Sequence, residues 1–148
     1  MNIFIGIIKY FIVPIILFLI SREDIKSKTV PYKYLLLLVL FLILISILNE
    51  FLISNLMVFI GILIVMSVIA MLFKNSLGFG DVLIFSIIGS IYGLKEFITV
   101  LTFSTFLVFI FSVIKLIIQK QRELGETLPY VPFIFLSLLI KIVLLIWE

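Results

Sequence analysis

Long runs of apolar residues, separated by short polar connections, make up most of this chain. Six such stretches each predict a helix, and they cover Ile3 to Ile20, Tyr34 to Leu48, Phe51 to Phe73, Val82 to Leu94, Phe97 to Ile118 and Leu128 to Trp147. A helix needs about 20 apolar residues to cross a bilayer core of about 30 Å. The second and fourth stretches are shorter, so we expect them to tilt, to extend into their loops or to stop short of one surface, and five helices is the alternative count.

The composition of the chain indicates that these predicted helices span a membrane. Of the 148 residues, 65% are hydrophobic, and the mean hydropathy is +1.49. A chain of this length cannot bury so much apolar surface inside a soluble core. The predicted fold is therefore all-α: a polytopic membrane protein with about six transmembrane helices, embedded in the lipid bilayer. The polar connections are too short to separate domains, so residues 1–148 are expected to form a single domain, and the first stretch lacks the flanks of a cleaved signal peptide.

Residue types that are absent narrow the possible chemistry. The chain has no cysteine and no histidine, which excludes disulfides, thiolate nucleophiles, the usual zinc ligands and the usual general base. Chemistry must then come from carboxylates, lysines or hydroxyls. The net charge of +3 forms no basic face large enough to follow phosphates, so no nucleic-acid partner is expected.

Basic residues in the connections predict how the chain is oriented. The odd-numbered connections carry nearly all of them, whereas the even-numbered connections hold only Lys95. Because basic loops stay in the cytoplasm, the odd connections are predicted to be cytoplasmic and both termini to lie outside, in a multi-pass protein of the inner cell membrane. The basic residues of the odd connections are Arg22, Lys26, Lys28, Lys33, Lys74, Lys120 and Arg122.

Two aspartates, the only ones in the chain, fall on this cytoplasmic side. Asp24 stands in SREDIKSKTVP, after the first apolar stretch, and Asp81 stands in GFGD, before the fourth. Two neighbouring carboxylates cannot both ionise easily, so such a pair holds one proton and supplies one base and one acid at neutral pH. This is aspartyl-protease chemistry: the base activates a water, while the acid hydrogen-bonds the peptide carbonyl and helps to protonate the leaving amine. It requires no metal.

The residues around the aspartates allow a plainer interpretation as well. Gly78 and Gly80 lack a Cβ, so they can adopt backbone angles that other residues avoid and can let a substrate backbone approach Asp81. Alternatively, the two glycines only end the third helix and Asp81 only caps the fourth. For Asp24, the alternative is a solvated charge in a juxtamembrane loop.

Three segments, in order along the chain, carry a resemblance to a known family: DIKSKTVPYKYLLLL, GFGDVLIFSIIGSIYGL and LPYVPFIFLS. Together they resemble the type IV prepilin peptidases and archaeal preflagellin peptidases, which are membrane aspartyl peptidases with a GxGD motif. The resemblance implies a GxGD aspartyl protease core in which Asp24 and Asp81 are the catalytic pair. It also implies that loop support and substrate access come from Gly78, Gly80, Pro31, Pro129 and Pro132.

The resemblance further implies the reaction. The expected substrate is a prepilin-like or preflagellin-like precursor, whose short basic leader is cleaved at the cytoplasmic face. Larger bacterial members also have a cysteine-rich cytoplasmic segment and N-methylate the product. Nothing in this sequence supplies that segment, so we expect an aspartic-type endopeptidase without methyltransferase activity, zinc or S-adenosylmethionine. Family members often carry Asn and Lys where this chain has Tyr32 and Leu83.

Two other functions are compatible with a pair of carboxylates in a membrane protein. One is a small ion or proton transporter, which needs acidic groups near mid-membrane or a pathway to the outer face. The other is a non-catalytic membrane subunit of a pilus or secretion assembly.

A few residues within the stretches are expected to have structural roles. Long side chains can extend to a nearby surface, and we expect this of Lys9, Lys115 and Lys141. Tyr130 and Tyr92 are expected in the aromatic belts of the inner and outer boundaries. Gly89 and Gly93 form a pair of small residues that lets another helix approach, from the same chain or from a second copy in a homo-oligomer.

Overall fold

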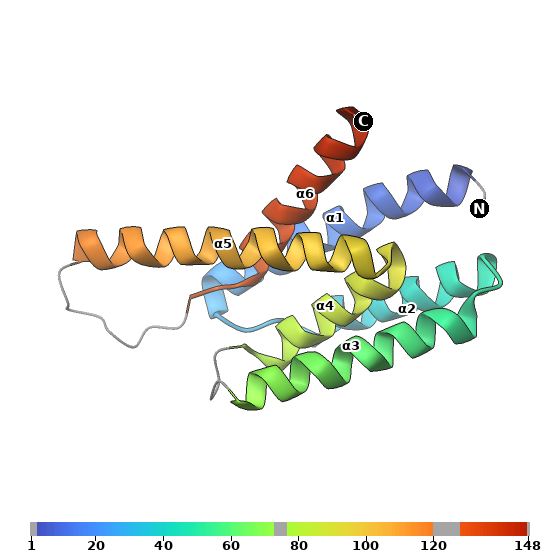
Figure 1. Cartoon of the computed structure of the whole chain (residues 1–148), viewed down its shortest axis with the longest axis horizontal. Helices are drawn as coiled ribbons and strands as arrows, with labels where there is room; N and C mark the ends of the chain where they lie inside the picture. Colours follow the sequence, from blue (N-terminus) through green and yellow to red (C-terminus); the bar gives the residue numbers. More distant parts are fainter. Residues whose placement is uncertain (1–2, 73–76, 120–127, 148) are drawn as a thin grey trace.

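The computed structural model describes residues 3–72, 77–119 and 128–147 of the chain. Within these residues it contains six helices and no strand, which confirms the all-α prediction and the count of six. Figure 1 shows their course. The helices are α1 (Ile3–Ser27), α2 (Tyr32–Leu48), α3 (Leu52–Leu72), α4 (Phe79–Tyr92), α5 (Leu94–Gln119) and α6 (Val131–Trp147).

Both aspartates belong to helices. α1 continues beyond the apolar stretch that predicted it and includes Asp24, because the segment after Ile20 contains no Gly or Pro that would end a helix. α4 begins at Phe79, ahead of the predicted Val82, and so includes Asp81 in its first turn. The two carboxylates are therefore fixed to regular backbone at helix ends.

Exposed apolar side chains cover the outer helices. Two helices, Leu52–Leu72 and Leu94–Ile118, are long and apolar enough to cross a membrane by length and composition, and only 11% of the most apolar part of each is buried. On α3, for example, Ile53 is 71% exposed and Met71 is 79% exposed. Soluble monomers rarely expose continuous apolar surface of this kind. α2, α4 and the apolar part of α6 are shorter, so spanning by all six helices stays a prediction.

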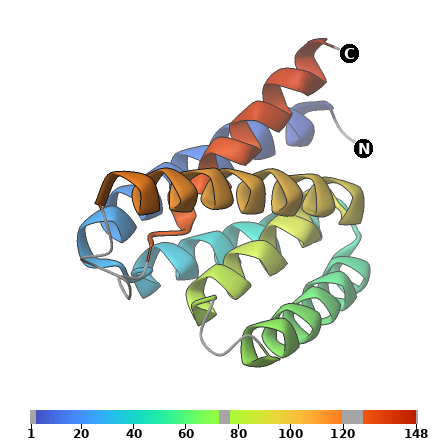
Figure 2. The same ribbon diagram turned by 60° about the vertical axis from the view of Figure 1, so that its left-hand side comes forward.

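α4 is the central helix of the bundle. Its side chains from Asp81 to Ile91 are buried, apart from Leu83. It packs against α2, α3 and α5, while α6 packs against α1 and α5, and Figure 2 shows α4 between α3 and α5. The shortest helix thus lies where neighbouring protein, rather than lipid or water, surrounds it.

Gly89 marks the closest approach of two helices. A Cβ at this position would overlap Cδ1 of Ile62 on α3, so a larger residue here would require that side chain to move. Gly93 has a different role: its φ of 98° ends α4, and its N–H donates a hydrogen bond to the Gly89 carbonyl. The helix that approaches Gly89 is therefore α3 of the same chain.

The two ends of the bundle differ in what they contain. The α1–α2 connection, the start of α4 and the start of α6 lie together at one end, which we call the aspartate end (Figure 1). The α2–α3 turn, the α4–α5 turn, the start of α1 and the end of α6 lie toward the other end, which we call the far end. This arrangement agrees with the prediction that the odd connections share one side. Of the basic residues behind that prediction, Lys74, Lys120 and Arg122 lie outside the described residues.

Candidate active site

Asp24 lies against the beginning of α6. Its side chain is 4% exposed, and its Oδ2 accepts a hydrogen bond of 3.2 Å from the backbone N–H of Val131, the first residue of α6. The backbone of Tyr130 also donates to this carboxylate. A carboxylate at the N-terminus of a helix is stabilised by the free N–H groups and by the helix dipole. The alternative of a solvated loop charge is therefore wrong for Asp24.

Asp81 is buried in the first turn of α4. Its side chain is 9% exposed, and its Oδ2 accepts a hydrogen bond of 3.2 Å from the N–H of Gly78. In return, the N–H of Asp81 donates to the Gly78 carbonyl at 3.0 Å. Asp81 therefore does cap α4, as the plainer interpretation proposed. Gly78 does not end α3, however, because α3 ends at Leu72.

The two carboxylates influence each other although they lie on different helices. Burial raises the pKa of Asp24, and the backbone hydrogen bonds from Val131 and Tyr130 oppose this rise. Burial and then the charge of Asp24 raise the pKa of Asp81 to about 7, against the hydrogen bond from Gly78. Because backbone donors stabilise the ionised form of Asp24, the pair favours an ionised Asp24 beside a protonated Asp81 near neutral pH.

Gly80 allows the first connection to pack directly on the start of α4. A Cβ on Gly80 would lie 2.7 Å from Cβ of Val30 and 2.8 Å from its Cγ2, distances that real side chains do not adopt. Neither Gly78 nor Gly80 has a positive φ. The expectation that these glycines supply unusual backbone angles is therefore wrong. The close approach at Gly80 is real, but the group that approaches is Val30 of the same chain.

The three prolines of the predicted site stand at helix beginnings. Pro31 is the N-cap of α2, with φ −72° and ψ 125°, and its carbonyl accepts hydrogen bonds from the N–H groups of Tyr34 and Leu35. Pro129 and Pro132 flank the α6 N-terminus that holds Asp24. Proline suits the first turn of a helix because its missing N–H would have no intrahelical acceptor there. The prolines thus shape the backbone around the aspartates.

The structure adds Tyr130 to the residues that the sequence predicted. Its backbone binds Asp24, and its ring packs edge-on against Phe85, one turn after Asp81, with the ring centroids 5.8 Å apart. The sequence placed Tyr130 only in an aromatic belt. The signal that could have found it is its position between Pro129 and Pro132. Tyr32 and Leu83 do not join the pair: Tyr32 is 85% exposed at the start of α2.

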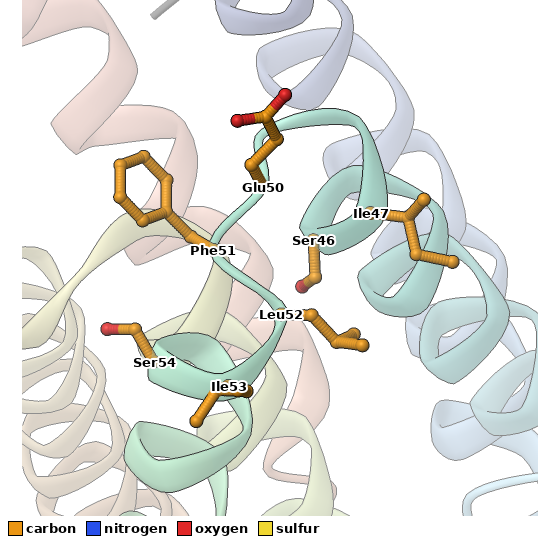
Figure 3. A pocket seen from close by; sticks show the side chains of 7 residues that line it. All are labelled: Ser46, Ile47, Glu50, Phe51, Leu52, Ile53 and Ser54. Carbon is orange, nitrogen blue, oxygen red and sulfur yellow. The ribbon is translucent and has the colours of Figure 1, made fainter.

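A hollow of the bundle lies away from the two aspartates. It has a volume of about 390 Å³ and is formed at the α2–α3 turn, at the far end, by Ser46, Ile47, Glu50, Phe51, Leu52, Ile53 and Ser54 (Figure 3). Asn55 donates a hydrogen bond to Ser46 behind it, and Ser90 of α4 donates to the Asn55 carbonyl. Neither aspartate lines this hollow, so the candidate site is the carboxylate pair.

Comparison with known proteins bears on this site. A family model described as the type IV leader peptidase family matches residues 11–113, which is 103 of the 148 residues. The matched region contains both aspartates, Val30 and Gly80, and it stops before α6. Comparisons with curated proteins and with solved structures give no match.

Proposed function

The chain belongs to the type IV leader peptidase family, and on this premise we propose that it is a membrane aspartyl endopeptidase with Asp24 and Asp81 as its catalytic pair. The family is one of peptidases, and together with the apolar helices it indicates a protein of the inner membrane. The observation that carries the proposal is the coupled, buried pair of carboxylates, each held by backbone N–H groups at a helix N-terminus.

The proposed mechanism gives each aspartate a separate role. Asp24, whose ionised form is favoured by the α6 N-terminus, accepts a proton from the water that attacks the peptide carbonyl. Asp81 starts protonated, donates a hydrogen bond to the carbonyl oxygen as negative charge develops there, and helps to protonate the leaving amine. Water adds to the carbonyl carbon, the C–N bond breaks, and the two products are a carboxylic acid and an amine.

The proposed substrate is a prepilin-like or preflagellin-like precursor with a short basic leader, cleaved at the cytoplasmic face. We place the aspartate end at that face, with all six helices in the membrane as one domain and both termini outside. Methyltransferase activity is not part of the proposal. A transporter is supported less well, because Asp24 belongs to the last turn of α1 and Asp81 to the first turn of α4, and both of these helix ends lie at the aspartate end.

The direct test is co-expression with a tagged prepilin-like precursor from the same genome. Mass spectrometry of the precursor is expected to show loss of the leader with the unchanged protein, and a new N-terminus without an added methyl group. The matched control is the double variant D24N/D81N, purified to confirm that it is inserted and folded. An intact precursor with the unchanged protein, for every leader-bearing candidate tested, would instead favour a non-catalytic membrane subunit.

The pH dependence of cleavage follows from the two roles. The rate is expected to fall as pH rises through about 7, because Asp81 then loses the proton that it donates. It is also expected to fall at acidic pH, where Asp24 becomes protonated and can no longer act as the base. The measurement is kcat/KM against pH for the purified enzyme in detergent. A rate that continues to increase well above neutral pH would contradict the role of Asp81 as the acid.

A further inference from the structure

A second group of charged residues lies inside the bundle, away from the aspartates. Lys9 of α1 and Lys141 of α6 are only 8% and 6% exposed. With Glu96 in the first turn of α5 and the rings of Tyr10 and Tyr92, they form what we call the lysine cluster. The expectation that these two lysines extend to a surface is wrong. Tyr92 packs on Lys9 at the end of α4, and its place at the outer boundary stays a prediction.

The contacts of the two ammonium groups are unequal. Nζ of Lys141 lies 2.6 Å from Oε2 of Glu96. Nζ of Lys9 lies over two aromatic rings instead, 5.2 Å from the centroid of Tyr10 and 5.3 Å from that of Tyr92. The Tyr92 hydroxyl donates to the Lys9 carbonyl at 2.8 Å, so it is already bonded to backbone. Lys141 also faces the Tyr10 ring, at 5.6 Å.

The lysine cluster therefore holds one positive charge in excess. Within the described residues, Glu96 is the carboxylate that pairs with it, against two ammonium groups. Aromatic faces attract a cation, but they do not neutralise it. A buried charge without a partner is unfavourable, and in a membrane protein it is a strong indication of a functional site. The excess charge calls for an anion.

The N-terminus of α5, which carries Glu96 of the lysine cluster, adds backbone N–H donors and a positive electrostatic potential. α5 starts at Leu94, directly after Gly93, and Glu96 of the lysine cluster belongs to its first turn. The N–H of Phe97 is bonded to the Gly93 carbonyl, whereas the N–H groups before it have no acceptor within the helix. Free N–H groups and the positive end of the helix dipole favour a phosphate or a similar anion. Two independent features thus favour the same ligand.

We propose that the lysine cluster and the N-terminus of α5 bind the phosphate group of an anionic phospholipid in the outer leaflet. The proposal rests on the membrane embedding proposed above, not on the peptidase activity. The far end then lies at the outer surface, where phospholipid phosphates are the abundant anions. Lys9 is the principal ligand, because Lys141 already pairs with Glu96.

The test is lipid retention by the purified full-length protein. The protein is delipidated in detergent, incubated with phosphatidylglycerol or phosphatidylcholine, and examined by native mass spectrometry. Phosphatidylglycerol is expected to bind about tenfold more tightly than phosphatidylcholine, and Lys9→Met to remove this preference. Lys115→Met is the matched control, because Lys115 belongs to α5 outside the lysine cluster and is expected to leave the preference unchanged.

Glu96→Gln makes the test independent of whether Lys9→Met folds well. Removing the internal carboxylate frees Lys141, so phosphatidylglycerol is expected to bind more tightly to this variant than to the unchanged protein. Weaker binding of phosphatidylglycerol to Glu96→Gln would show that the lysine cluster only holds helices together, and it would overturn the proposal. Equal retention of the two lipids by the unchanged protein would also overturn it. The melting temperature is also compared with phosphatidylglycerol and with inorganic phosphate. If inorganic phosphate raises it as much as phosphatidylglycerol does, the assignment to a lipid is overturned. Leader cleavage is not measured, so failure here is distinct from failure of the peptidase proposal.

Discussion

Replacing Asp81 with asparagine is expected to abolish leader cleavage and, at the same time, to make the folded protein more stable at alkaline pH. Asparagine cannot donate the proton that the leaving amine needs, so the rate should fall by at least about 10³-fold. Its side-chain oxygen can still accept the hydrogen bond from Gly78, which preserves the cap of α4. Loss of activity is therefore not expected to come from unfolding.

The gain in stability follows from the raised pKa of Asp81. The pKa is about 7 in the folded protein and 3.8 in an unperturbed chain, so the folded state binds this proton more tightly. The stabilising contribution of the protonated carboxyl is complete at low pH, and it is lost as pH rises from about 4 to about 7. At one pKa unit per roughly 1.4 kcal/mol, the loss is on the order of 4 kcal/mol. Asparagine stays neutral and avoids it.

Melting temperatures in detergent, at pH values on both sides of 7, measure this effect. The D81N variant should melt higher than the unchanged protein above neutral pH, and the difference should shrink as pH falls and vanish below about pH 4, where Asp81 is protonated in both the folded and the unfolded state. D24N is the matched control, because it is also expected to lose cleavage. It removes a carboxylate that the α6 N-terminus stabilises, so its increase in melting temperature should be smaller than that of D81N. If D81N is stable and still cleaves the precursor, the proposed mechanism is wrong. If D81N is less stable than the unchanged protein at every pH, the role of Asp81 is to cap α4.

The fold was predictable from the sequence because its main signal is long range and simple. Six apolar stretches became six helices, whereas the orientation that the basic residues indicate stays a prediction. Helix ends were less predictable, because apolar runs show what can be buried rather than where a helix stops. Polar residues after Ile20 continue α1 as far as Ser27, and they carry Asp24 with them.

The candidate site was predictable only as far as it consists of distinctive side chains. Asp24 and Asp81 were identifiable because they are the only two aspartates in the sequence. Their hydrogen-bond donors are the backbone N–H groups of Val131 and Gly78. Every residue except proline has such a group, so the sequence does not indicate which ones bind the aspartates. The lysines show the same limit: whether Lys141 extends to a surface depends on Glu96, which a different helix places beside it. Such pairings depend on tertiary structure.

Replacing Gly80 with alanine is expected to reduce cleavage by about 10²-fold without touching either carboxylate. The new Cβ would lie 2.7 Å from Cβ of Val30, so the first connection must move away from the start of α4. That connection follows the Asp24 end of α1, and displacement of a catalytic group by about 1 Å costs a factor of this size. Overpacking should also cost roughly 1–3 kcal/mol of stability. Gly61→Ala is the matched control, because a Cβ there meets nothing within 4 Å.

Substitutions at Val30 separate displacement from a general loss of folding. In the Gly80→Ala background, Val30→Gly removes the three atoms nearest to the new Cβ, so it should restore much of the cleavage. Val30→Ala leaves its Cβ at 2.7 Å and should restore less, although it removes the two methyl groups. The effects of the two sites are then strongly non-additive, as expected for residues in contact. Additive losses in all combinations would mean that Gly80 acts through something other than Val30, and the close packing of the first connection on α4 would not be what sets the distance between the two aspartates.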